Sequence, residues 1–279
     1  MTPPSLTLPE RGGPGRRPLG WLLAATGDGV VRRLEALLVF AAFCATAVAA
    51  ALRRDSWRRP VRAAFMDALY RVAVQSATTT LVTGLLLGFV LVTQVVYWLQ
   101  TAGQAQLVGS IVVRLLVREI APVVVGLIIF GRVGTGILVT LGEAQPAGWL
   151  RQLERQGIDP MTLLVMPRMV AFSIGAFCLV TLLIVSTLVT GYLIASALGI
   201  VTAPIWRFGQ NVLFAMDLSD FILPPIKCMV IGMAIALVCS ATALARATQT
   251  YELQRLVQRG FVRAALAILV VSGLFDLVA

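Results

Sequence analysis

Four charged side chains lie in or beside one long apolar stretch, where a charge needs a specific partner. Arg114, Arg118 and Glu119 come just before the stretch, and Arg132 lies within it. An arginine guanidinium binds phosphate oxygens through charge-assisted hydrogen bonds, and a neighbouring glutamate can instead hold it in an ion pair. A charge deep in an apolar stretch is costly unless it is paired or faces a wet cavity. We therefore consider two interpretations of these residues, contact with an anionic ligand or partner and a cluster of ion pairs, and for Arg132 also bonds to backbone carbonyls.

Residue types that support catalysis or metal binding are scarce. The sequence has no histidine, and its thirteen acidic residues lie mostly near the ends of apolar stretches. The closest acidic pair, Asp217 and Asp220, precedes a predicted helix and is interpreted as helix-capping. The four cysteines all lie within apolar stretches, without the paired spacing of a disulfide or metal site. We therefore predict no catalytic residue, no metal site and no cofactor, and we do not expect an enzyme.

The single lysine, Lys227, follows the sequence Leu-Pro-Pro-Ile. A P-loop instead places its lysine directly after a glycine-rich turn, so this chain does not carry that ATP-binding motif. Any ATP hydrolysis that drives the protein is expected on a partner subunit.

The composition identifies an integral membrane protein. Of the 279 residues, 58% are hydrophobic and 13% are charged, about half the charged fraction of a soluble domain. Apolar runs occur at 34–52, 72–99, 120–141, 162–199, 221–245 and 261–279, and a helix of roughly 20 such residues crosses a bilayer. The net charge of +10 comes mainly from arginines that flank these runs, which is typical of a positive-inside topology rather than of nucleic-acid binding.

The charge distribution also predicts an orientation. If the last five runs span, one side of the membrane holds residues 1–71, 142–168 and 246–263, with 18 of the 23 basic residues. This side should be cytoplasmic, so the N-terminus is inside and the C-terminus is at the outer face. The run 34–52 has arginines at both ends, which favours a helix at the interface or a re-entrant helix over a span. Residues 1–30 are rich in proline, glycine and arginine and predict a disordered cytoplasmic tail.

The segment between the second and third spans predicts a short amphipathic helix at 146–156. Pro146 suits its first turn, Gly157 suits its C-cap, and Asp159 can cap the next helix. Its apolar face is formed by Trp149, Leu150 and Leu153, and Arg151, Glu154 and Arg155 are among its polar residues. Such a helix either lies on the membrane surface or fits into a cleft of a cytoplasmic partner.

Several short motifs follow one another in a specific order. They are Val117-Arg118-Glu119 with Pro122, Gly131-Arg132-Val133-Gly134, Gly157-Ile158-Asp159-Pro160, and Pro167-Arg168. Taken together, they resemble the MlaE/YrbE permease family of lipid-transporting ABC systems. The stretches 69–76 and 275–278 agree with the same family, and the likeness covers residues 55–279. Each motif alone is weak evidence, but the ordered set is specific.

The resemblance implies an all-α membrane protein with an N-terminal interfacial or re-entrant helix, five transmembrane helices and a short cytoplasmic coupling helix. Residues 31–279 would form one permease domain, and the protein would reside in the bacterial inner membrane. Its implied partners are an ABC ATPase subunit, an MCE-domain protein, a second permease copy or a paralogue, and membrane lipids. Trp149, Leu150, Arg151, Leu153, Glu154, Arg155 and Asp159 would meet the ATPase, and Arg114, Arg118, Glu119 and Arg132 would face the lipid or the outer partner.

The chain departs from the family pattern in the coupling region. Thr140 stands where the family usually has a glutamate, and Gly148-Trp149-Leu150-Arg151 replaces an acidic stretch. Two hypotheses follow. The chain is the permease subunit of an ABC-type phospholipid transport complex linked to an MCE-domain protein, or it is a non-coupling structural half of a heterodimeric permease that scaffolds such a complex.

Overall fold

The structure is a computed structural model. It describes 59–102, 116–144, 161–199, 218–244 and 253–278, together with Ala42, 44–49, Ala51, Gln152, Leu153, 155–157, Asp159, Pro204, Trp206, Arg207 and Gln210. Every regular element among these residues is a helix, so the all-α prediction is confirmed. The predicted tail at 1–30 lies outside the described residues. Only Ala42, 44–49 and Ala51 of the run 34–52 are described, so its interfacial position stays a prediction.

Five helical segments are long and apolar enough to cross a membrane, as predicted: Arg59–Leu91, Leu116–Glu143, Met161–Ala197, Ile222–Leu244 and Gln254–Leu277. The first starts well before the predicted position 72, and the last starts before 261. The reason is that both helices open with amphipathic turns, in which charged residues such as Arg62 and Asp67 interrupt the apolar sequence but not the helix.

Four π-helical turns are built into these spans. The first span consists of α2 (Arg59–Leu69), η2 (Tyr70–Val74) and α3 (Gln75–Ala102), and the second of η3 (Leu116–Ile120), α5 (Ala121–Ile129), η4 (Phe130–Gly134) and α6 (Thr135–Ala144). The third consists of η5 (Met161–Val165) and α8 (Met166–Ala197), followed by α10 (Leu218–Leu244) and α11 (Leu253–Val278). The turn η3 ends two residues before Pro122, and η5 ends two residues before Pro167. Because proline has no N–H, each of these prolines removes one of the regular α-helical hydrogen bonds.

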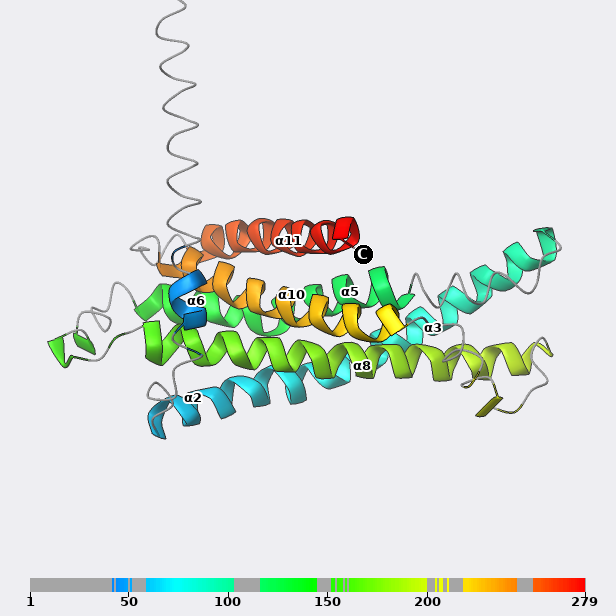
Figure 1. The fold of residues 1–279 in the computed structure, drawn as a ribbon, viewed down its shortest axis with the longest axis horizontal. Helices are drawn as coiled ribbons and strands as arrows, with labels where there is room; N and C mark the ends of the chain where they lie inside the picture. The colour runs from blue at the N-terminus through cyan, green and yellow to red at the C-terminus, as the bar shows by residue number, and fades with distance from the viewer. Residues whose placement is uncertain are drawn as a thin grey trace, which may run out of the picture. The chain divides into compact units, whose positions relative to one another are not determined.

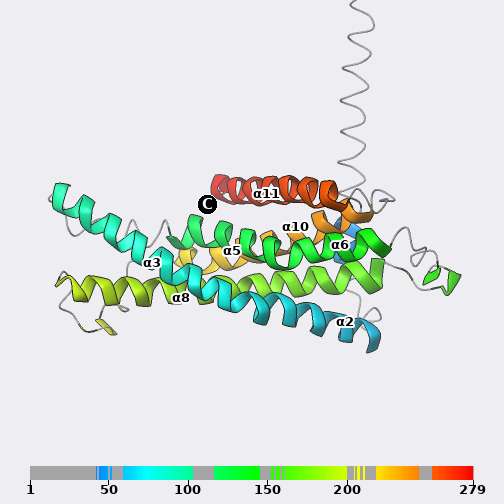
Figure 2. The same cartoon turned by 180° about the vertical axis from the view of Figure 1, so that it is seen from behind.

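Helix α8 lies at the centre of the packing. It contacts α2 and α3 on one side and α5 and α10 on another, and α10 in turn contacts α6 and α11 (Figures 1 and 2). Phe172, Leu179 and Leu183 of α8 and Ile231 and Ile235 of α10 are fully buried. The core is therefore formed mainly between the third and fourth spans, with the other spans around it.

Glycines allow α3 to approach α8 closely. A Cβ at Gly88 would lie 2.5 Å from the Thr187 carbonyl oxygen, and one at Gly84 would collide with Ser186. The Thr187 hydroxyl also donates a hydrogen bond of 3.1 Å to the Gly84 carbonyl oxygen. In lipid, such close packing replaces the hydrophobic driving force that holds soluble helices together. Gly84 and Gly88 form a G-x-x-x-G motif, and this motif packs two helices of the same chain against each other.

Replacing Gly88 by alanine should push α3 away from α8. The added Cβ requires a backbone shift, and overpacking of this kind costs roughly 1–3 kcal/mol. Thermal unfolding of the detergent-solubilised protein should therefore show a lower midpoint than wild type. Gly273→Ala is the matched control, because a Cβ at Gly273 meets no atom of the described residues within 4 Å. Equal midpoints for the two variants would contradict this packing.

Candidate functional site

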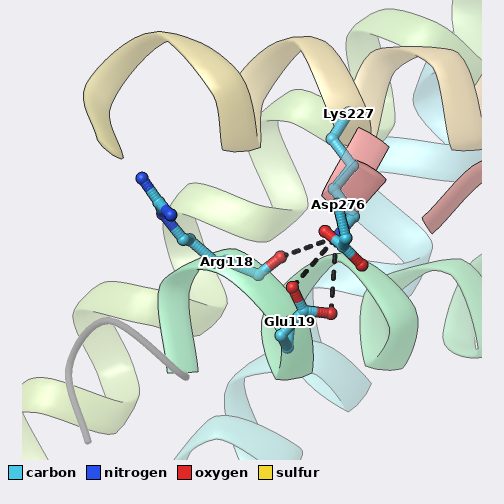
Figure 3. A network of polar contacts seen from close by, with 4 residues as sticks. All are labelled: Arg118, Glu119, Lys227 and Asp276. Atoms are coloured by element: carbon cyan, nitrogen blue, oxygen red, sulfur yellow. Dashed lines mark hydrogen bonds and ion pairs between the residues drawn. The ribbon is translucent and has the colours of Figure 1, made fainter. Parts of the chain in front are cut away.

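A polar cluster joins three of the five spans around Lys227. The Lys227 Nζ donates to Oδ1 of Asp276 at 2.6 Å and to the carbonyl oxygen of Arg118 at 3.0 Å, and it lies 3.5 Å from both carboxylate oxygens of Glu119 (Figure 3). These residues belong to α10, α11 and η3. Lys227 is thus the shared partner that connects the second, fourth and fifth spans.

The cluster is stable because the Lys227 ammonium needs hydrogen-bond acceptors and the Arg118 carbonyl needs a donor. The Lys227 side chain is only 4% exposed, and a buried ammonium is costly unless its three donors find acceptors. In a regular α-helix the Arg118 carbonyl would accept from the N–H of residue 122, but Pro122 has none. Lys227 therefore supplies the hydrogen bond that the proline removes.

The cluster lies near the ends of the second, fourth and fifth spans and beside the middle of the longer third span. The Cys228 Sγ donates to the carbonyl oxygen of Ala176 at 3.3 Å, so Lys227 is level with the middle of the Met161–Ala197 span. Arg118 and Glu119 were predicted to lie just outside the second span, whereas the structure includes both in it. The difference arises because the π-helical turn η3 continues the helix through these two charged residues, which hydropathy alone leaves out.

A pocket of about 150 Å³ opens beside the cluster. Its polar wall is formed by Arg118, Glu119, Lys227 and Asp276, and its apolar wall by Leu223, Pro224 and Phe275. Glu119 and Asp276 are 39% and 40% exposed, so both carboxylates remain accessible. The pocket can therefore contact a ligand that carries both polar and apolar parts.

The two charged residues next to each other in η3 point differently. The Glu119 carboxylate points towards Lys227, whereas the Arg118 side chain points away from the cluster and only its carbonyl faces the lysine (Figure 3). The Arg118 guanidinium is thus placed at the edge of the pocket.

Arg132 lies apart from this pocket. It is exposed on η4, and its Nη2 donates to the backbone carbonyl oxygen of Gln75 at 2.9 Å. Of the alternatives considered for Arg132, the structure contains the bond to a backbone carbonyl, and contact with a lipid or partner stays a prediction. The structure therefore brings together only Arg118 and Glu119 of the four predicted residues, and Arg114 lies outside the described residues.

Sequence reasoning missed Lys227 and Asp276 as members of the site. A signal was available, because Lys227 is the one charge within the run 221–245 and Asp276 is the one acidic residue within the run 261–279. The second and fourth spans start on the same side of the membrane, and the fifth ends there. Glu119 and Lys227 near two starts and Asp276 near one end are therefore at similar depth.

The segment between α6 and η5 is described at Gln152, Leu153, 155–157 and Asp159. Gln152, Leu153 and Arg155 are helical, Leu153 is buried and Arg155 is exposed. The helix ends at Gly157, whose φ of 72° is the left-handed conformation of a C-cap. The four remaining predicted coupling residues, Trp149, Leu150, Arg151 and Glu154, lie outside the described residues.

Asp159 caps the third span, as predicted. Its Oδ1 accepts from the Met161 N–H at 3.1 Å, and its Oδ2 accepts from the Thr162 hydroxyl at 2.7 Å. Both carboxylate oxygens thus have partners within the chain. The two caps hold the short helix close to the start of η5.

Comparison with known proteins places this fold in a family. A probable ABC transporter permease of Synechocystis is 28% identical over 176 residues, which are 63% of this chain and 66% of the relative. A probable ABC transporter permease of Rickettsia typhi is 36% identical over 87 residues, 31% of this chain and 34% of the relative. The intermembrane phospholipid transport system permease MlaE of Haemophilus influenzae is 31% identical over 100 residues, 36% of this chain and 38% of the relative.

The aligned part thus spans just under two thirds of the first of these relatives and about a third of the other two. The family described as Permease MlaE matches residues 65–278, which include all five spans except the first turns of α2. The chain is a multi-pass membrane protein that belongs to the MlaE permease family.

Proposed function

We propose that this chain is the transmembrane permease subunit of an ABC-type complex that transports phospholipids and is linked to an MCE-domain protein. The observation that carries the proposal is the pocket beside Lys227, in which charged and apolar walls meet at the level of the middle of the third span. The Haemophilus relative is named as a phospholipid transport permease, which supports the same substrate class.

The walls of the pocket suit a phospholipid headgroup. Arg118 and Lys227 can attract a phosphate, the exposed carboxylates of Glu119 and Asp276 can accept from an amine or hydroxyl of the headgroup, and the apolar wall can contact the start of an acyl chain. A volume of about 150 Å³ is well below the roughly 300–1,000 Å³ of a typical ligand site. The acyl chains therefore need space outside this pocket, which a second permease copy or a paralogue would help to enclose.

The proposed complex draws its energy from a separate ATPase subunit. The only lysine of the sequence is committed to the buried cluster, so the lysine of a P-loop must come from a partner. In this proposal the segment 146–156 is the coupling helix on the cytoplasmic side, and the MCE-domain protein binds at the periplasmic side. The N-terminus is then cytoplasmic, the C-terminus is periplasmic, and the complex resides in the bacterial inner membrane.

A tagged copy of this chain, purified from its native membrane in mild detergent, should carry an ATPase subunit and an MCE-domain protein. The complex should hydrolyse ATP, whereas the chain purified alone should not. Mass spectrometry of the purified complex and an ATPase assay measure both. A stable complex without any nucleotide-binding subunit would argue against the proposal.

Filling the pocket should stop transport without changing its charges. Leu223→Trp adds bulk to the apolar wall, and we expect ATP-dependent transfer of a fluorescent phospholipid by the reconstituted complex to fall at least about tenfold, since the site no longer admits the headgroup. Ile222→Trp is the matched control, because Ile222 is 52% exposed and does not line the pocket. If both variants transport at the wild-type rate, the pocket is not on the lipid path.

The coupling segment distinguishes an active permease from a structural half. Replacing Gly148-Trp149-Leu150-Arg151 by an acidic stretch of the family type should change the ATPase rate of the complex several-fold, because these residues would face the ATPase. The rate is measured with the complex in lipid nanodiscs. An unchanged rate would support the scaffolding alternative instead.

A further inference from the structure

The Lys227 ammonium has no N–H group left for a ligand. An ammonium has three N–H donors. They meet Oδ1 of Asp276 at 2.6 Å, the Arg118 carbonyl oxygen at 3.0 Å and the Glu119 carboxylate, whose two oxygens both lie at 3.5 Å. The lysine side chain is also almost completely buried. A ligand in the pocket therefore meets the carboxylates that surround Lys227 rather than the lysine itself.

The two carboxylates carry more negative charge than Lys227 neutralises. When both are ionised, Glu119 and Asp276 oppose two negative charges to one ammonium. Both lie within 3.5 Å of the same nitrogen atom and are thus close to each other. Like charges this close are unfavourable unless a cation or a proton lies between them. The other basic residue of the pocket wall, Arg118, points its guanidinium away from them (Figure 3).

The accessible side of this cluster accepts hydrogen bonds. Both carboxylates are partly exposed, and an ionised carboxylate has about four lone-pair sites, more than the contact with one lysine uses. Asp276 holds Lys227 through the shorter contact, 2.6 Å against 3.5 Å for Glu119. Glu119 is therefore the carboxylate that a ligand can engage without displacing the main counter-ion of the lysine.

The volume of the pocket fits a small donor. A pocket of about 150 Å³ has the share of about five water molecules in the liquid. An ethanolamine group is of this size, and its methylene carbons can contact Leu223 and Phe275 of the apolar wall. A choline group carries additional methyl groups and no N–H, and a glycerol group carries no positive charge. Among common headgroups, ethanolamine therefore matches both the volume and the charge of the pocket.

We propose, building on the proposed function, that the pocket selects phospholipids whose headgroup ends in a primary ammonium, and that Glu119 determines this preference. The ammonium donates to Glu119 and Asp276 and supplies the positive charge that Lys227 alone does not provide. The phosphate of the same headgroup then lies at the edge of the pocket, on the side of the Arg118 guanidinium. The separation of charges along the pocket thus follows that of a zwitterionic headgroup.

Native mass spectrometry of the purified, delipidated full-length chain tests this selection. The probes are short-chain phosphatidylethanolamine and phosphatidylglycerol with identical acyl chains. Wild type should bind the ethanolamine lipid at least about tenfold more tightly, the difference expected for one charge-assisted hydrogen bond. Glu119→Gln should remove this preference, and it should fold because Asp276 still neutralises Lys227. Glu143→Gln, which removes an exposed carboxylate of α6 away from the pocket, should retain it.

Two further probes identify the recognised part of the ligand. Phosphatidylcholine should bind about as weakly as phosphatidylglycerol, because its ammonium has no N–H to donate. Free phosphoethanolamine should compete only weakly, because it lacks acyl chains. Affinity for phosphatidylcholine equal to that for phosphatidylethanolamine would overturn donation by the ammonium. Equal affinity for phosphoethanolamine and the lipid would overturn a lipid as the source of the amine.

The wild-type chain alone can contradict the selection, since equal affinity for the ethanolamine and glycerol lipids would overturn it. An unchanged preference in Glu119→Gln would overturn the role of Glu119. These binding results are independent of transport. A reconstituted complex that prefers the ethanolamine lipid in binding but transfers no fluorescent phospholipid would contradict the proposed function and leave the preference in place.

Discussion

A single buried ammonium group is the constraint on which the arrangement of three spans depends. Lys227 is nearly buried, and its acceptors come from η3 and α11. Removing one partner of such a cluster typically costs about 3–5 kcal/mol, because the other charges stay buried and uncompensated. The second, fourth and fifth spans can therefore slide past one another only at the cost of breaking these contacts. The depth of each helix is fixed by charge, whereas its lateral packing is fixed by shape.

Proline and glycine residues shape two different helix contacts in this fold. Pro122 lies two residues after the π-helical turn η3 and has no N–H to donate to the Arg118 carbonyl. This carbonyl therefore accepts from Lys227 instead. On the opposite side of α8, Gly84 and Gly88 bring α3 into backbone contact. Helix α8 is thus held against α3 by van der Waals contact. On its other side, α8 packs on α10, which carries Lys227 of the polar cluster.

The sequence predicted what depends on neighbouring residues and missed what depends on depth. The five spans and the Gly157 and Asp159 caps follow from local patterns, and the structure contains them. The pairing of Lys227 with Asp276 joins residues 49 apart, and it requires the vertical registration of two helices. Hydropathy predicts the length of a span, but it does not predict the position of that span along a longer neighbouring helix such as α8. Hydropathy likewise placed Glu119 just outside the second span, although the helix continues through it.

The continuity of α8 provides a physical route from the proposed coupling segment to the pocket. Asp159, two residues after Gly157, caps the first turn of η5, and η5 continues without a break into α8. Helix α8 is buried along much of its length, so a push at its start is transmitted as a rigid displacement rather than as bending. Because Cys228 binds Ala176 of α8, such a displacement reaches α10 one residue from Lys227. Motion at the cap would then act on the one group that holds the three spans in register, and the pocket beside it would change shape.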